Sequence, residues 1–174
     1  MDDKFIRKAI RKKFSSFRQY VVLEEVCVTT GFDNYNTPRR IDMIVCDCFE
    51  SNNFAIEGIE IKISKGDLMR ELKDPEKHEV FFGNIDFYSI AAPTDLLKEN
   101  KDLIPEEWGL LGIDEQGLAK YIRKPKPVTS EFWFEKQRTV RKGFFASCMR
   151  NAMKQINEKI ETKSKEISNE TNFI

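Results

Sequence analysis

The sequence predicts an α/β fold in which a mixed β-sheet carries helices on both of its faces. Three features of the 174 residues lead to this prediction. An amphipathic helix pattern comes first, short segments rich in β-branched residues alternate with helical ones through the middle, and a long helical stripe comes near the C-terminus. Apolar residues make up 40% of the chain and include 14 Phe, so we expect one ordinary hydrophobic core and exclude a disordered chain.

The first element is an N-terminal helix over residues 3–17, with Asp2 or Asp3 as its cap. Apolar residues recur there at spacings of four and three, which places them on one helical face. These residues are Ile6, Ile10, Phe14 and Phe17.

Six later segments are predicted as strands, because they are short and rich in β-branched or aromatic residues. They cover residues 20–29, 40–49, 54–63, 86–92, 109–113 and 118–123. The turn at 50–53 joins the second and third strands into a β-hairpin, and Pro93 ends the fourth. Because the third strand is so apolar, we expect it in the interior of the sheet.

Helices fill the remaining segments. Short ones are predicted over 66–73, 75–82 and 94–100, and a long one over 139–163. The stripe on the long helix consists of Phe145, Met149, Ala152, Ile156 and Ile160. We expect a core over residues 1–128 and a helical extension over 129–174 that packs on the same domain, with its last ten residues frayed.

Two charged residues interrupt the second half of the third strand on one side only. Glu60 and Lys62 share a face, whereas Ile59, Ile61 and Ile63 line the other. A buried charge costs several kcal/mol unless it is paired or bound to a metal, so these two residues require a partner.

The hairpin register supplies that partner. In an antiparallel hairpin, the residue numbers of every directly paired couple add up to the same sum. If that sum is even, Asp42 lies opposite Glu60 or Lys62 on the same face. An odd sum would set Asp42 against Ile61 and mix charge with the core. The hydrophobic pattern therefore predicts the even register, with two carboxylates and one ammonium group at one site.

These residue types suit hydrolysis of a phosphodiester. Asp42 and Glu60 are hard-oxygen ligands for Mg²⁺ or Mn²⁺, and the backbone carbonyl of Ile61 could add a third oxygen. Such a metal lowers the pKa of its bound water and neutralises phosphate charge. Lys62 could orient the attacking water or stabilise the transition state. The alternative is a buried ion network in which the charges pair with one another and have no catalytic function.

The pattern of Asp42, a hairpin, and then Glu60-Ile61-Lys62 resembles the motif of the PD-(D/E)XK nuclease superfamily. Residues 39–44, 60–64 and 86–93, with Asp67-Leu68 and Lys77, are similar to the small MmcB-like DNA-repair nuclease family. The match covers roughly residues 20–93.

This resemblance implies an αβββαβ restriction-endonuclease-like core over residues 1–128. It also implies Mg²⁺-dependent DNA cleavage, with Asp42 and Glu60 as metal ligands and Lys62 as a catalytic residue. We expect an endonuclease or exonuclease in DNA repair, recombination or phage DNA processing. The alternative is a catalytically inert nuclease-like module that binds DNA or a partner protein.

The chain departs from the superfamily pattern in two places. Ile41 stands where the motif has proline. The superfamily often adds an acid from the first helix, but residues 4–18 contain none, so Glu24 or Glu25 must serve. Strand parity leaves both glutamates open, and the resemblance favours Glu25 as a further metal ligand.

Charge is segregated along a chain whose net charge is zero, with 29 basic and 29 acidic residues. That balance excludes DNA binding by bulk charge alone. Residues 4–18 nevertheless carry seven basic groups and no acid, and residues 120–142 carry eight against two acids. We expect DNA contacts from Arg7, Lys8, Arg11, Lys12, Arg40, Ser64 and Lys77.

The remaining expectations concern location and assembly. The charged start has no apolar run behind it, and no apolar stretch reaches the 18 residues of a membrane span, so we expect neither secretion nor a membrane partner. The four cysteines are too few and too scattered for a disulfide scaffold, which favours the reducing cytoplasm. The long C-terminal helix leaves a homodimer open.

Overall fold

A six-stranded mixed β-sheet forms the centre of the structure, a computed structural model that describes residues 1–27, 40–73, 81–128 and 137–171. The strands lie in chain order across the sheet: β1 (Tyr20–Cys27), β2 (Arg40–Asp47), β3 (Ile56–Ile61), β4 (Phe87–Pro93), β5 (Gly109–Ile113) and β6 (Ala119–Arg123). β3 pairs parallel with β4, and β4 with β5, whereas the other neighbours pair antiparallel. The α/β fold with its mixed sheet is confirmed, and β3 lies in the interior as predicted.

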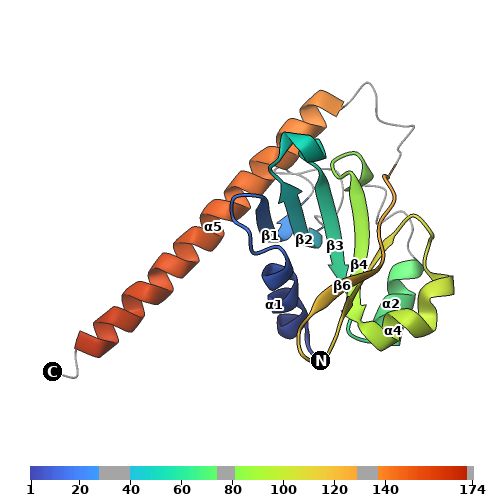
Figure 1. Ribbon diagram of the computed structural model, residues 1–174. Coiled ribbons are helices and arrows are strands. Elements are labelled where there is room, and N and C mark those ends of the chain that lie inside the picture. The colour runs from blue at the N-terminus through green and yellow to red at the C-terminus, as the bar shows by residue number, and fades with distance from the viewer. Residues whose placement is uncertain (28–39, 74–80, 129–136, 172–174) are drawn as a thin grey trace.

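Helices cover both faces of this sheet, as Figure 1 shows. They are α1 (Asp3–Lys13), α2 (Lys65–Leu72), α4 (Thr94–Asn100) and α5 (Gln137–Thr171), with 3-10 turns η1 (Glu50–Asn52) and η2 (Lys101–Leu103). Ile6 and Ile10 of α1 pack in the core on one face. Leu68 of α2 and Leu97 of α4 pack in the core on the other face.

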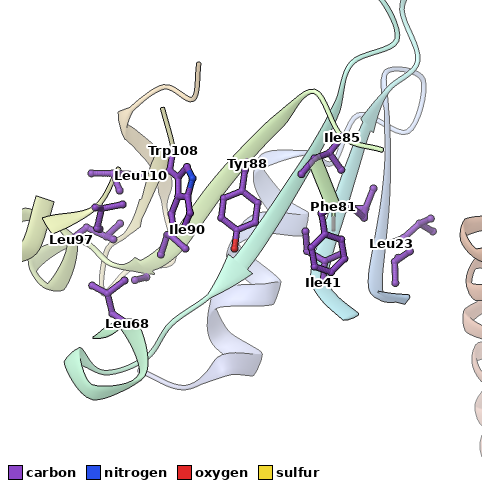
Figure 2. Packing of buried hydrophobic residues seen from close by; sticks show 14 of the residues in the cluster. Leu23, Ile41, Leu68, Phe81, Ile85, Tyr88, Ile90, Leu97, Trp108 and Leu110 are labelled. Carbon is purple, nitrogen blue, oxygen red and sulfur yellow. The ribbon is translucent and has the colours of Figure 1, made fainter. Parts of the chain in front are cut away.

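The core on the side of α2 and α4 surrounds a tyrosine (Figure 2). Tyr88 of β4 is fully buried, and its ring packs edge-on against Trp108 with the ring centroids 4.8 Å apart. A buried phenol needs a hydrogen-bond partner for its hydroxyl group. That partner is part of the candidate site described below.

The β2–β3 hairpin has the predicted even register. Met43 pairs with Ile59 and Cys46 with Ile56. The same register, continued by one residue, sets Asp42 across from Glu60. The site residues of the two strands therefore meet at one end of the hairpin, away from its turn.

α1 ends earlier than the apolar spacing predicts. Asp2 caps the helix by accepting a hydrogen bond from the Phe5 amide at 2.8 Å. The helix stops at Lys13 because the next residue, Phe14, leaves helical geometry and packs edge-on against Tyr20. Phe17, predicted on the apolar face, is 84% exposed.

α5 runs along β1 and extends beyond the sheet (Figure 1). Among the α5 residues whose burial the structure describes, Phe144 and Cys148 are buried, and each stands one position before a member of the predicted stripe. One residue rotates a helix by about 100°, so this shift turns most of the stripe away from the core, although Ala152 still packs against it. Phe145 and Met149 are accordingly exposed. The homodimer stays a prediction of the sequence.

Other boundaries differ by a few residues. α5 is helical to Thr171 rather than to residue 163. β2 ends at Asp47, because the Asp47 side chain accepts a hydrogen bond from the Phe49 amide and the chain turns there. The helix predicted over 75–82 lies mostly outside the described residues.

Candidate active site

The Asp42 side chain is joined to the end of β3. Its Oδ2 atom accepts a hydrogen bond of 2.8 Å from the Ile61 amide. In a regular β-ladder, a backbone carbonyl of the neighbouring strand would accept such a bond. This contact fixes Asp42 beside the residues on either side of Ile61, which are Glu60 and Lys62.

Lys62 lies between two buried carboxylates. Its Nζ atom is 2.6 Å from Oε2 of Glu71 and 3.2 Å from Oε2 of Glu60. The three residues are 5%, 4% and 3% exposed in that order. The Tyr88 hydroxyl donates to Oε1 of Glu71 at 3.4 Å. We call Glu60, Lys62, Glu71 and Tyr88 the lysine cluster.

α2 brings Glu71 to this cluster. Ser64 is the N-cap of the helix, and its Oγ atom accepts a hydrogen bond from the Asp67 amide. Leu68 anchors the helix in the core, and Glu71 follows one turn later on the same buried side. Ser64, expected to contact DNA, therefore has a capping role in the structure.

The pKa shifts in the lysine cluster have clear causes. Burial lowers the pKa of Lys62, but Glu60 and Glu71 outweigh it and raise the value above that of an ordinary lysine. The ammonium form is therefore favoured. Burial, followed by the charges of Glu60, Glu71 and Asp42, raises the pKa of Tyr88 well above its usual value. The placement of Asp42 itself rests on its hydrogen bond to the Ile61 amide, between Glu60 and Lys62.

A second group of charges surrounds Arg7 of α1, which is 15% exposed. Its Nε atom is 2.6 Å from Asp3 and its Nη2 atom is 2.6 Å from Glu25. Its Nη1 atom donates to the Asp42 carbonyl at 2.9 Å, while Nη2 is 3.7 Å from the Asp42 carboxylate. Glu24 completes the set at 3.6 Å. We call Arg7, Asp3, Glu24, Glu25 and Asp42 the arginine cluster.

A break in strand alternation lets two consecutive glutamates reach Arg7. Glu25 has a left-handed backbone with φ of 55°. Leu23 and Val26 consequently both pack in the core, whereas regular alternation would set them on opposite faces. A left-handed conformation costs about 1–2 kcal/mol in a residue with a Cβ atom. Asn151 of α5 donates to the carbonyls of both glutamates and supports the break.

The other basic residues expected to contact DNA differ in their surroundings. Lys8 and Lys12 of α1 are exposed. Arg11 is 2.5 Å from Glu24, and Arg40 is 3.2 Å from Glu25. Lys77 lies outside the described residues.

β3 carries one further acid, on the opposite face from Glu60. Glu57 accepts hydrogen bonds from the hydroxyls of Ser89 at 2.5 Å and Tyr121 at 2.6 Å. Burial raises the pKa of Glu57 although both hydroxyls donate to it. Hydroxyl donors satisfy this carboxylate, so it belongs to neither cluster.

The donor set at the hairpin end fits a hydrated Mg²⁺ or Mn²⁺. Proteins usually hold Mg²⁺ by one or two carboxylates and leave several waters on the ion. Asp42 and Glu60 are two such carboxylates on facing strand positions, and the Ile61 carbonyl lies between Glu60 and Lys62. Over the described ranges, no three His, Cys, Asp or Glu side chains gather as a metal-holding group.

Sequence reasoning missed Glu71 and Tyr88. A signal for Glu71 was present, because an acid three residues after Leu68 lies on the apolar side of the predicted helix 66–73. Tyr88 carried no signal of its own, since a tyrosine in an apolar strand is ordinary core. The sequence left Glu24 and Glu25 open, and the structure brings both to Arg7.

Comparisons with known proteins add information on the fold. No family model matches the chain, and no curated protein matches it. Among solved structures, the chain is similar to SPO1766, a protein of unknown function from Silicibacter pomeroyi, with a TM-score of 0.64 and 18% sequence identity. The similarity covers 91% of this chain and 90% of that one. At this identity it supports the fold and carries no activity.

Proposed function

We propose that the chain is a metal-dependent deoxyribonuclease of the PD-(D/E)XK type, similar to the MmcB-like family. The observation that carries the proposal is the hydrogen bond from the Ile61 amide to Asp42, beside the buried pair of Glu60 and Lys62. The hydrogen bond joins Asp42 to Ile61, which stands between Glu60 and Lys62 in the chain. Metal-dependent hydrolysis of a phosphodiester uses such a combination of hard-oxygen ligands and a cationic side chain.

Each residue has a role in this proposal. Asp42, Glu60 and the Ile61 carbonyl would hold the ion, with Glu25 as a further oxygen donor if Arg7 releases it. When bound, Mg²⁺ lowers the pKa of a water and neutralises phosphate charge. Lys62, held as an ammonium group, stabilises the negative charge that develops on the phosphate.

The test is the response of the wild-type protein to Mg²⁺. We expect Mg²⁺ or Mn²⁺ to support nicking of supercoiled plasmid or trimming of end-labelled linear DNA, and EDTA to abolish it. The first substrate reports endonuclease action and the second exonuclease action. We also expect Mg²⁺ to raise the melting temperature, because an ion that binds only the folded state stabilises it. Indifference to Mg²⁺ in both assays would remove the proposal.

DNA would approach across the exposed side of α1. Lys8 and Lys12 are one helical turn apart and exposed there, whereas Arg7 and Arg11 are paired with carboxylates. Lys8 and Lys12 are therefore the better candidates for direct phosphate contacts. Arg40 is also exposed beside the hairpin end, but it contacts Glu25 at 3.2 Å and is therefore a weaker candidate than the two lysines.

Replacing Lys8 and Lys12 together by Gln should weaken DNA binding without unfolding the chain. Each phosphate contact contributes about 0.9 to the slope of log affinity against log salt on duplex DNA, so the slope should fall by about 2. Fluorescence anisotropy between 50 and 200 mM salt measures it. The matched control replaces the exposed Lys98 and Lys101 of the opposite layer. An unchanged slope in the α1 variant would show that these lysines are only solvated surface.

A specific observation favours a second candidate, the inert nuclease-like module that binds DNA or a partner protein. Both clusters already pair their charges internally: Lys62 with Glu60 and Glu71, and Arg7 with Glu25 and its neighbours. Ion networks of this kind also occur without catalysis. Salt-dependent DNA binding without Mg²⁺-dependent cleavage would select this candidate.

We also propose a cytoplasmic location. Cys27, Cys46, Cys48 and Cys148 are free thiols in the structure. Burial raises the pKa of Cys46 to about 12 and that of Cys148 to about 11, which keeps both as unreactive thiols. None of the helices in the described part of the chain has the length and apolar character needed to cross a membrane.

A further inference from the structure

Glu71 is closer to Lys62 than Glu60 is, although Glu60 and Lys62 form the expected motif. The distances from Nζ are 2.6 Å to Glu71 and 3.2 Å to Glu60. All three side chains are nearly fully buried, so little water screens their charges. Two carboxylates share one ammonium group, and the shorter contact is with the residue outside the motif.

We propose that Glu71 is a positioning residue that holds the Lys62 ammonium group and thereby keeps the Glu60 carboxylate available to a divalent cation. The cluster of Glu60, Glu71 and Lys62 then carries one net negative charge. Without Glu71, the ammonium group would neutralise Glu60, and the site would attract a cation less strongly.

Tyr88 orients Glu71 for this task. Its hydroxyl donates to Oε1 of Glu71, which leaves Oε2 directed at Lys62. The Tyr88 ring is fixed against Trp108 and Phe82, so the donor has a defined position. Ser64, as the cap of α2, holds the helix that carries Glu71. The metal-binding part of this inference rests on the proposed function, whereas the placement of Lys62 does not.

The test compares Glu71→Gln with wild type by three measurements. Gln keeps the shape of the side chain and removes its charge. We expect Mn²⁺ affinity to fall about tenfold to a hundredfold and kcat to fall with it. KM for DNA should change less than twofold, because Glu71 acts on the metal site through Lys62 and makes no contact with DNA. We also expect the Lys62 ammonium group to lose order in ¹⁵N NMR relaxation, a readout that needs no cleavage.

Two further variants keep the test decisive if Glu71→Gln does not fold. Tyr88→Phe removes only the donor to Glu71 and should produce a smaller change of the same kind. Glu71→Asp keeps the charge and should recover part of the Mn²⁺ affinity. The matched control is Glu99→Gln on α4, an exposed glutamate that should change nothing.

The outcomes separate this inference from the proposed function. Wild-type cleavage with unchanged kcat, Mn²⁺ affinity and Lys62 order in Glu71→Gln would overturn the inference and leave the nuclease standing. A wild type that neither cleaves DNA nor binds Mn²⁺, with Lys62 disordered in Glu71→Gln, would overturn the nuclease and support the placement of Lys62 by Glu71.

Discussion

Lys62→Met should lower the rate of DNA cleavage by about a hundredfold or more, while Mn²⁺ still binds. Methionine keeps most of the length of the lysine stem and removes only the ammonium group, and loss of one electrostatic stabiliser costs about 10²–10³ in rate. Asp42→Asn should behave differently, because it removes the negative charge of a proposed ligand of the ion. In that variant, Mn²⁺ affinity and cleavage should fall together. Initial rates at saturating Mn²⁺ and calorimetric titration with Mn²⁺ separate the two patterns.

The same substitution should make folding depend on the metal. Lys62→Met leaves Glu60 and Glu71 buried without their shared cation, and breaking a buried ion pair costs about 3–5 kcal/mol. A bound divalent cation would compensate part of that charge, so Mg²⁺ should raise the melting temperature of the variant more than that of wild type. Lys65→Met, at an exposed position of α2, is the control. Equal Mg²⁺ responses, with no cleavage by wild type, would indicate an inert ion network.

The hairpin could be predicted from sequence because its pattern is local. Alternation along β3 separates Glu60 from Ile59 and Ile61, and only the even register keeps charge away from the core. A one-residue slip would bury Asp42 among isoleucines, so the energetic preference is strong. The predicted register and the interior position of β3 are therefore confirmed.

The arginine cluster could not be predicted in this way. Arg7 follows the buried Ile6 on α1, and the sequence reads equally as a solvated basic face. The partners Glu24 and Glu25 reach it together only because Glu25 adopts a left-handed backbone. Glutamate is not a residue that signals such a conformation, which is enriched in Gly, Asn and Asp.

Helix faces were harder to predict than strand faces. On α5, the exposed Phe145 and the buried Phe144 are neighbours, so a stripe of apolar residues does not identify which side meets β1. On α2, the buried side includes Glu71. A charged residue is not expected in a core, so its burial could be predicted only with knowledge of its partner, Lys62. In both cases the missing information is the packing partner, which lies far away along the chain.

Arg7→Met should destabilise the fold by about 2 kcal/mol. Removing one partner of a fully buried pair costs about 3–5 kcal/mol, and the cost is smaller here because the carboxylates around Arg7 are partly exposed to water. The matched control, Lys8→Met on the same helix, should stay within about 0.5 kcal/mol of wild type. Urea denaturation of both variants gives the comparison.

A double-mutant cycle shows whether the cost comes from the cluster. Glu25→Gln removes one carboxylate that Arg7 holds at 2.6 Å, so Arg7→Met should cost about 1 kcal/mol less in that background. Arg7 also donates to the Asp42 carbonyl, and its loss should loosen the hairpin end that Asp42 joins to Ile61. If a divalent cation binds Asp42, Mg²⁺ should recover part of the lost stability in Arg7→Met and none in Arg7→Met/Asp42→Asn. Additive costs for Arg7 and Glu25 would mean that this ion pair contributes nothing, and that Arg7 stabilises the fold through its other contacts or the packing of its side-chain stem.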